Sequence, residues 1–328
     1  MSQRMAPVFR YVLLTEIALD DHTFIVTYRP EMQALQRSVA HVGVLTPLHL
    51  RQPSDQALLQ VVCGSKRLLA CQQTGHTSVP ALVYGATELS EQRAFLLALH
   101  DNLGCRVLNA VEKGRILLRL QQHFGYQPNT LLQEFCPLLD LPPRAETLEA
   151  YTRLATLEDS LQAAVVEGSL PLETALWIGA YSTEDRQALL DLFTGLKVGT
   201  NRAREFVTYI DEICQRDACT PATLLQALGV PEFLAATQLS APQKLESVRR
   251  VLRQARYPQL STYEQRFQEA ARRLRLPPQI SLRPPPYFEG QQYQVTLSFG
   301  QRQELQQYAR RLLDAAQHEA LDTLLELL

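Results

Sequence analysis

The sequence lacks a bias toward either charge, and it lacks long apolar runs. Its 328 residues include 32 Lys and Arg against 34 Asp and Glu, so any basic surface must be confined to one region. No apolar run reaches the length of a membrane-spanning helix, and residues 1–7 lack the apolar core of a signal peptide. We therefore expect a cytoplasmic protein without membrane contact.

Cysteine is scarce, and the common glycine-rich phosphate loops are missing. The six cysteines form no Cys-x-x-Cys pair, which argues against a zinc module and favours free thiols in a reducing compartment. The chain contains neither a P-loop nor a dinucleotide-binding fingerprint, and no internal repeat. With 46% apolar residues, a chain of this length is expected to form two or three globular domains.

The most informative segment carries three short blocks in order. They are residues 43–48 (GVLTPL), 63–70 (CGSKRLLA) and 101–112 (DNLGCRVLNAVE). Beside them, residues 48–51 and 58–63 have strand patterns, and the segment between them has turn chemistry. The second strand is largely apolar, and we interpret Cys63 within it as a small core residue.

The second block joins a buried strand to a helix through a glycine. Gly64 allows the backbone to approach a ligand closely, and a helix that begins at Ser65 offers unpaired N–H groups to an anion. Lys66 and Arg67 add positive charge, and Arg67 can donate to two phosphate oxygens. The alternative is that Ser65 only caps the helix while both cations face solvent.

The third block closes another helix. Residues 79–84 form a strand in which Pro80 predicts an edge position or a strand start, and residues 91–103 form the helix. Asp101 and Asn102 lie at its C-terminal end, where a carboxylate opposes the helix dipole. A cation or metal would compensate that charge, and plain solvation is the alternative.

These blocks resemble the ParB/RepB family of partition proteins over residues 10–212. That family has a Gly-Val-Leu-x-Pro block, then Gly-Glu-Arg-Arg-x-Arg-Ala, then a helix that ends in Glu-Asn-Leu-Gln-Arg-x-x-Leu-Asn-Pro-x-Glu. The resemblance implies an α+β fold with three parts. These are a ParB/sulfiredoxin-like N-terminal α/β domain, a central all-α helix-turn-helix domain and a small C-terminal strand-helix dimerisation module.

The resemblance also implies domain boundaries and a function. It implies a nucleotide-binding domain over residues 1–115, a DNA-binding domain over 116–230, a basic helical linker over 231–289 and the dimerisation module over 290–328. Such a protein would be a homodimeric, nucleoid-associated clamp that binds CTP and Mg²⁺ and closes around double-stranded DNA. It would act with a ParA-type ATPase in chromosome or plasmid partition and show at most weak CTPase activity. A phosphotransferase or ATPase on the same fold, and a degenerate interaction protein without DNA binding, are the alternatives.

The resemblance assigns roles to residues of the three blocks. Asp101 would be the catalytic residue of any turnover, and Asn102 would hold Mg²⁺. Ser65 and Lys66 replace the family's glutamate and arginine, and Leu69 replaces its last arginine, so the sequence favours nucleotide binding over hydrolysis. The predicted nucleotide-binding residues are Thr46, Gly64, Ser65, Lys66, Arg67 and Asn102.

Residues 144–157 form the candidate DNA-reading helix after a break at residues 140–143. In a helix-turn-helix, the N-terminal residues of the second helix meet base edges. The predicted DNA contacts are Arg144 and Thr147 at base edges and Arg153 at a phosphate. Because acidic side chains share this helix, a helical bundle that no longer reads DNA is the alternative.

The last third combines a basic stretch with proline segments. Residues 244–275 are rich in arginine and predict either a nucleic-acid footprint or a solvated helix face. The prolines within residues 276–278 and 283–286 predict a stiff connector. A strand at residues 293–299 and two helices follow. They are too few to bury their own apolar faces, which predicts pairing with a second copy, and folding of this tail back on its own chain is the alternative.

Overall fold

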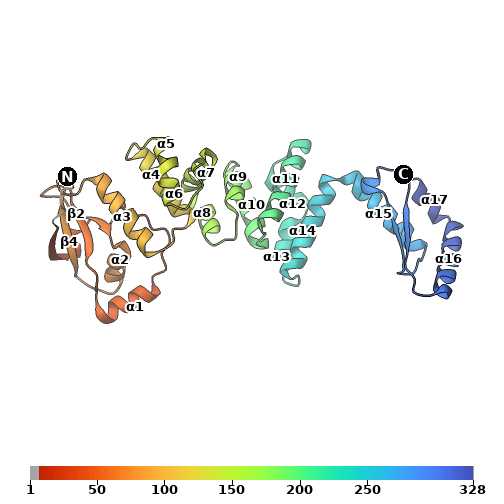
Figure 1. The fold of residues 1–328 in the computed structure, drawn as a ribbon, viewed down its shortest axis with the longest axis horizontal. Coiled ribbons are helices and arrows are strands. Elements are labelled where there is room, and N and C mark those ends of the chain that lie inside the picture. The colour runs from red at the N-terminus through yellow and green to blue at the C-terminus, as the bar shows by residue number, and fades with distance from the viewer. Residues whose placement is uncertain (1–6, 328) are drawn as a thin grey trace. The chain divides into compact units, whose positions relative to one another are not determined.

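The computed structural model describes residues 7–327, and residues 1–6 and 328 lie outside the described part. The prediction that residues 1–7 lack a signal-peptide core therefore concerns mostly residues outside the described part. Leu328, the last residue of the final predicted helix, also lies outside it. Helices and two small β-sheets confirm a mixed α+β fold. Packing divides the chain into two compact units, Met1–Arg186 and Gln187–Leu328 (Figure 1).

A four-stranded sheet forms the base of the first unit. Its spatial order is β1 (Val8–Leu13), β4 (Ser78–Gly85), β2 (Leu48–Gln52) and β3 (Gln60–Cys63). β4 runs antiparallel to β1 and parallel to β2, while β2 and β3 are antiparallel neighbours. The sequence patterns missed β1 because only Val12 of this strand is buried, so the strand lacks the alternation of a half-buried strand.

Pro80 lies near the start of a strand inside the sheet, so of the two predicted positions the edge is wrong and the strand start agrees with the structure. Pro80 is the third residue of β4 and faces Tyr11 of β1. The pairing of β4 with β2 starts only at Ala81, which is opposite Leu48. The proline, which lacks an N–H, therefore precedes the pairing with β2, and an interior strand tolerates the residue near its start.

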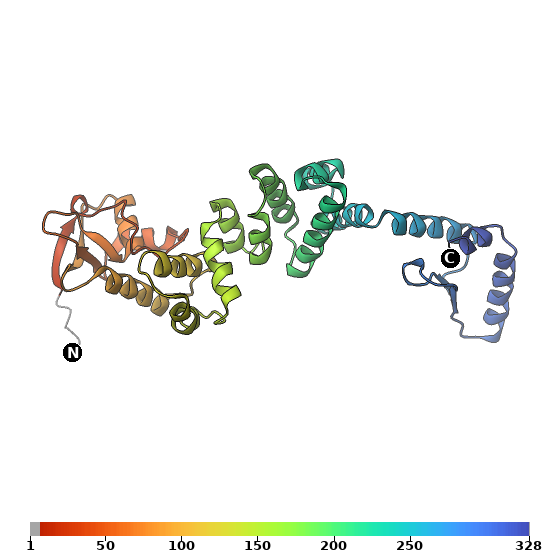
Figure 2. The same cartoon turned by 90° about the horizontal axis from the view of Figure 1, so that it is seen from above.

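Helices cover both faces of this sheet (Figure 2). α1 (Gln33–Val42) and α2 (Ser65–Gln73) contribute Val39 and Leu68 to a core that contains Ala81 of β4. α3 (Glu91–Cys105) packs Phe95 into a second core with Tyr84 of the same strand. Because Ala81 and Tyr84 point to opposite faces of β4, the sheet lies between α3 and the α1–α2 pair.

Further helical segments complete the first unit. α4 (Ala110–Gln122) begins at a capping box, in which Asn109 and Glu112 exchange side-chain and backbone hydrogen bonds. α7 (Ala145–Thr156) crosses α4 closely, because a Cβ on Gly114 would lie 2.2 Å from the carbonyl oxygen of Tyr151. The other segments are α5 (Pro128–Thr130), a π-helical turn (Leu131–Phe135), α6 (Cys136–Leu138), α8 (Asp159–Val166) and α9 (Leu172–Ile178).

In its described residues, 187–327, the second unit is helical apart from one two-stranded sheet. Its first helix, α10 (Thr183–Leu196), begins before the division between the units. The next helices are α11 (Thr200–Asp217), α12 (Pro221–Ala227), α13 (Val230–Ala235) and α14 (Ala241–Arg256). They are followed by α15 (Pro258–Arg273), β5 (Ile280–Arg283), β6 (Gln294–Leu297), α16 (Arg302–Ala316) and α17 (Ala320–Leu325). α15 packs against α17 around Phe288 and Leu324.

The region predicted as a stiff connector contains a strand, so that prediction was wrong. β5 pairs antiparallel with β6, and the prolines flank this strand without interrupting its pairing. α14 packs on α11 and α15 packs on α17, so both helices of the expected linker contribute to packing within the second unit. A boundary at residue 290 would separate β5 from β6, and the remaining predicted boundaries stay predictions.

Candidate functional site

A cavity of about 370 Å³ opens in the first unit. It lies between the start of α2, the end of α3 and residues 24–27 of the loop that precedes α1. The predicted residues that line it are Gly64, Ser65, Lys66, Arg67, Asp101 and Asn102. Folding therefore brings the second and third sequence blocks together around one space, while their binding roles stay predictions.

Gly64 turns the chain from β3 into α2. Its φ of 97° is in the left-handed region, and it is the N-cap, so the alternative in which Ser65 caps the helix is wrong. A Cβ on Gly64 would lie 3.0 Å from Leu48 Cγ and 3.2 Å from Arg67 Nη2. The first N–H groups of α2 have no partner within the helix, and Lys66 stands beside them.

Arg67 ties the first sequence block to the second. Its Nη1 donates to the carbonyl oxygens of Thr46 at 2.6 Å and Pro47 at 3.0 Å. Thr46 itself is exposed and does not line the cavity, so it reaches the site only through its carbonyl group. Part of the guanidinium is thereby held by backbone, and its remaining N–H groups are the ones available to an anion.

Asp101 and Asn102 differ in how firmly they are held at the end of α3. The Asn102 side chain donates to the Ala98 carbonyl at 2.8 Å and accepts from Arg106 Nε at 3.0 Å. Asp101 is exposed, and its negative charge acts on the buried Cys63. Burial first, and then Asp101, raise the pKa of the Cys63 thiol to about 12, which fits the interpretation of Cys63 as a core residue.

Arg106 is a cavity residue to which the sequence patterns gave no role. Its Nη1 donates to Glu112 at 2.7 Å and its Nη2 donates to Thr27 at 3.1 Å. Glu112 is only 1% exposed and also accepts the backbone N–H groups of Tyr28 at 2.9 Å and Asn109 at 3.0 Å. Arg106 and Glu112 stand in the third block, but they flank a break between two helices, where no periodic spacing predicts a contact.

The cavity wall formed by residues 24–27 is anchored to distant helices. Arg119 of α4 donates to the carbonyl oxygens of His22, Thr23 and Ile25, at 3.1, 2.7 and 3.2 Å. The Tyr28 hydroxyl donates to Asp159 of α8 at 2.7 Å. Burial, followed by this carboxylate, raises the pKa of Tyr28 to about 12.

The charges around the cavity fit an anion better than a divalent cation. Lys66, Arg67 and Arg106 line it, against the single carboxylate of Asp101 among the described lining residues. The side-chain oxygen of Asn102, the predicted Mg²⁺ ligand, already accepts a hydrogen bond from the Arg106 guanidinium. Within residues 7–327, no three His, Cys, Asp or Glu side chains gather in a way that would hold a metal. A phosphate group fits these donors, and Mg²⁺ at Asn102 does not fit them as they are arranged.

The three predicted DNA contacts of α7 do not share one face of the helix. Arg144 is the exposed N-cap residue and has an extended backbone, so the helical period does not place its side chain. Within α7, Arg153 lies about 120° from Thr147 around the axis and forms an ion pair with Glu149 at 3.8 Å. Arg144 and Thr147 both lie at the N-terminal end of the helix, while Arg153 points elsewhere. Their DNA contacts stay predictions.

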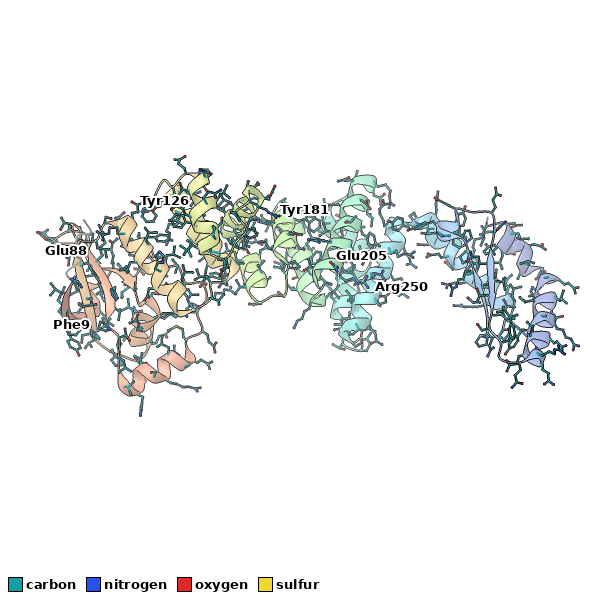
Figure 3. All side chains as sticks on the ribbon, viewed as in Figure 1. Phe9, Glu88, Tyr126, Tyr181, Glu205 and Arg250 are labelled. Atoms are coloured by element: carbon teal, nitrogen blue, oxygen red, sulfur yellow. The ribbon has the colours of Figure 1, made fainter. Side chains whose placement is uncertain are left out.

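Four of the nine basic residues at positions 244–275 form ion pairs with acidic side chains. Glu205 of α11, labelled in Figure 3, accepts from Arg249 at 2.9 Å. Arg253 donates to both oxygens of Glu264, each at 2.7 Å. These ion pairs, together with Arg256–Glu212, fasten α14 to its neighbours, which favours a structural role over a nucleic-acid footprint.

No helix in the described part of the chain is long and apolar enough to cross a membrane.

Comparison with known proteins identifies relatives of part of the chain. Residues 14–103 match the family described as the ParB N-terminal domain. A probable chromosome-partitioning protein ParB from Pseudomonas putida is 29% identical over 142 residues, which cover 43% of this chain and 45% of the relative. A probable plasmid-partitioning protein ParB from Deinococcus radiodurans is 28% identical over 222 residues, which cover 61% of this chain and 72% of that relative. The chain thus spans less than half the length of the Pseudomonas relative.

A solved structure also matches, at low similarity. The C-terminally truncated ParB from Caulobacter crescentus, complexed with CTP-gamma-S, is 23% identical and has a TM-score of 0.27. The match covers 57% of this chain and 98% of that one, but a superposition this poor supports no structural argument. The family match includes Gly64, Arg67, Asp101 and Asn102 of the cavity. Residues 14–103 therefore match the ParB N-terminal domain, and the chain is similar to ParB partitioning proteins over part of its length, which confirms the resemblance seen in the sequence.

Proposed function

We propose that this chain is a nucleotide-controlled partition protein that binds CTP in the cavity beside α2 and holds double-stranded DNA as a homodimer. The observation that carries the proposal is the start of α2. Gly64 turns the chain there, and the unpaired N–H groups of the helix stand beside Lys66 and Arg67 at the cavity. A helix N-terminus with adjoining cations is electrostatically favourable for phosphate groups.

Bound nucleotide would act on the helices through the cavity wall. Residues 24–27 form that wall, and hydrogen bonds connect the same loop to Arg119 of α4 and Asp159 of α8. A ligand that contacts the wall can therefore favour one arrangement of these helices over another, which is what switching between an open and a closed clamp requires. Turnover would be weak, with Asp101 as its acid–base residue.

DNA binding would use the N-terminal end of α7. Arg144 and Thr147 lie on neighbouring positions of this end, where a recognition helix meets base edges. Arg153 would contact a phosphate only after leaving Glu149. A ParA-type ATPase belongs to the same proposal and derives from the family resemblance, whereas the predicted Mg²⁺ is left out because the residues at Asn102 do not fit it.

Dimerisation would use the C-terminal part of the second unit. None of the 15 residues of α16 is buried, although its apolar side chains recur with helical spacing. Leu313 of α16 is 65% exposed, and Val295 of β6 is 50% exposed. A second copy of the chain would cover these side chains across a two-fold axis.

The test is binding of the four nucleoside triphosphates to the full chain, with and without DNA fragments from the source genome. CTP-selective binding that strengthens as particular fragments are enriched would support the proposal. Selective binding of ATP with turnover in the absence of DNA would indicate a phosphotransferase or ATPase instead. If no nucleotide bound and no DNA fragment were enriched, the chain would be a degenerate interaction protein.

A further inference from the structure

We infer that Arg106 supplies the positive charge that a divalent metal would otherwise bring to the nucleotide, so that the cavity binds a triphosphate without Mg²⁺. The inference rests on the proposed nucleotide site and goes beyond it, because it assigns the counter-charge to a residue of this chain. Arg106 lies outside residues 14–103, the part that matches the ParB N-terminal domain.

Arg106 is held in one orientation at the cavity. Its guanidinium donates through Nε to Asn102 at 3.0 Å, through Nη1 to Glu112 at 2.7 Å and through Nη2 to Thr27 at 3.1 Å. A guanidinium has five N–H groups, so two remain for a ligand. Because the three bonds come from different elements, the cation is positioned before any ligand arrives.

Arg106 lies at the end of α3, where a bound phosphate would otherwise need a metal ion to supply positive charge. The end of α3 carries the negative pole of the helix dipole and the carboxylate of Asp101, and both disfavour a phosphate. Arg106 is the C-cap of α3, where a cation offsets that pole. A triphosphate would thus lie between Lys66 and Arg67 on one side and Arg106 on the other.

The same geometry disfavours a metal at Asn102. Mg²⁺ binds oxygen ligands at about 2.1 Å and demands nearly octahedral surroundings. An ion on the side-chain oxygen of Asn102 would stand next to the guanidinium that already donates to this oxygen. The two positive charges would repel one another, so a metal could enter only if Arg106 left Asn102.

Titration calorimetry of the full chain with CTP, and separately with tripolyphosphate, in EDTA and in MgCl₂ tests this inference. For the wild type we expect Kd values in the two buffers that agree within about threefold. Arg106→Gln should weaken binding in EDTA by about tenfold or more, while Arg106→Lys, which keeps the charge but not the three positioning hydrogen bonds, should weaken it less. The matched control is Arg93→Gln, an exposed position of α3 that does not line the cavity and should behave as wild type.

The inference is overturned if the wild type loses about tenfold or more of its affinity in EDTA, or if Arg106→Gln binds as the wild type does. Arg106→Gln could fail to fold because Glu112 loses its partner. The affinities of the wild type in the two buffers, and that of Arg106→Lys, then still test the inference. Metal-independent binding of tripolyphosphate without any preference for CTP would remove the proposed function but support this inference. If neither ligand binds in EDTA, the inference is wrong.

Discussion

In the cavity, hydrogen-bond partners fix the orientation of the arginine side chains, and burial determines the protonation of the cysteines. The carbonyl groups of Thr46 and Pro47 hold Arg67, and Glu112 holds Arg106. Two cysteines show the same dependence, because both line the cavity but only Cys105 is exposed. Cys63 is 3% exposed, and burial raises the pKa of its thiol to about 12, so this residue is a neutral thiol across the physiological range.

We expect iodoacetamide to label Cys105 well before Cys63 at about pH 9. Cys105 is exposed, whereas Cys63 is buried with a raised pKa, and only an accessible thiolate reacts. Since the pKa of Cys63 is raised, its labelling should accelerate only as the pH approaches about 12. The neutral thiol stabilises the folded chain below the ordinary thiol pKa, and this contribution is lost as the pH rises towards about 12. Mass spectrometry of peptides from timed samples measures both rates, and equal rates at about pH 9 would contradict the assignment.

Gly64→Ala should weaken nucleotide binding and destabilise the fold by about 1–3 kcal/mol. Alanine at this position would have to adopt a left-handed backbone conformation. Its Cβ would also lie 3.2 Å from Arg67 Nη2 and would displace the guanidinium. Gly43→Ala is the matched control, because Gly43 also has a positive φ of 74° but a Cβ there would meet no atom within 4 Å. Calorimetric titration with CTP and urea unfolding compare the two variants. Equal affinities would show that Arg67 does not need its present position.

At the scale of elements, the close crossing of α4 and α7 depends on one glycine. Gly114 has the carbonyl oxygen of Tyr151 against it, where a Cβ would be only 2.2 Å away. The same helix carries the buried Glu112 in its first turn, and this side chain accepts the backbone N–H of Tyr28 from the loop at the cavity. Packing between these two helices is therefore connected to the position of the cavity wall.

Gly114→Ala should destabilise the first unit by about 1–3 kcal/mol, because the helices must separate to admit the methyl group. Gly104→Ala is the matched change on α3, where a Cβ would meet nothing within 4 Å. That variant should gain about 0.5–1 kcal/mol from the better helix propensity of alanine. Urea denaturation midpoints measure both effects, and a stabilised Gly114→Ala would show that α4 and α7 cross less closely than described.

At the scale of the whole molecule, apolar surface remains uncovered near the C-terminal end of the chain. α17 buries Leu324 against α15, whereas α16 buries none of its residues. Leu305 and Leu313 of α16 are 38% and 65% exposed. Exposed apolar side chains in a row on one helix mark an interaction surface, which agrees with the proposed homodimer.

The double variant Leu305→Lys/Leu313→Lys should raise the dissociation constant of the dimer by about a hundredfold, since both changes place charge in an apolar interface. Arg310→Ala on the same helix is the control and should leave the dimer intact. Sedimentation equilibrium of the full chains measures the mass of each variant, and circular dichroism checks that α16 remains helical. A double variant as dimeric as the wild type would place the interface elsewhere.

Local signals were sufficient for several elements and for part of the candidate site. β2, β3, α2, α3 and α7 were predicted because apolar periodicity, glycine and proline act over a few neighbouring residues. Gly64 and Arg67 were recognised for the same reason, since one short block contains them both. Arg106 and Thr27 were not, because their contact joins residues that are 79 positions apart.

By itself, the sequence determined several local elements, the glycine turn into α2 and the resemblance of residues 14–103 to the ParB N-terminal domain. Only the tertiary structure decided that β4 lies inside the sheet, that Glu112 meets Arg106 at the cavity and that carboxylates of α11 pair with the arginines of α14. The physical reason is that periodicity and turn chemistry are properties of neighbouring residues, whereas these contacts depend on how complete elements pack against one another.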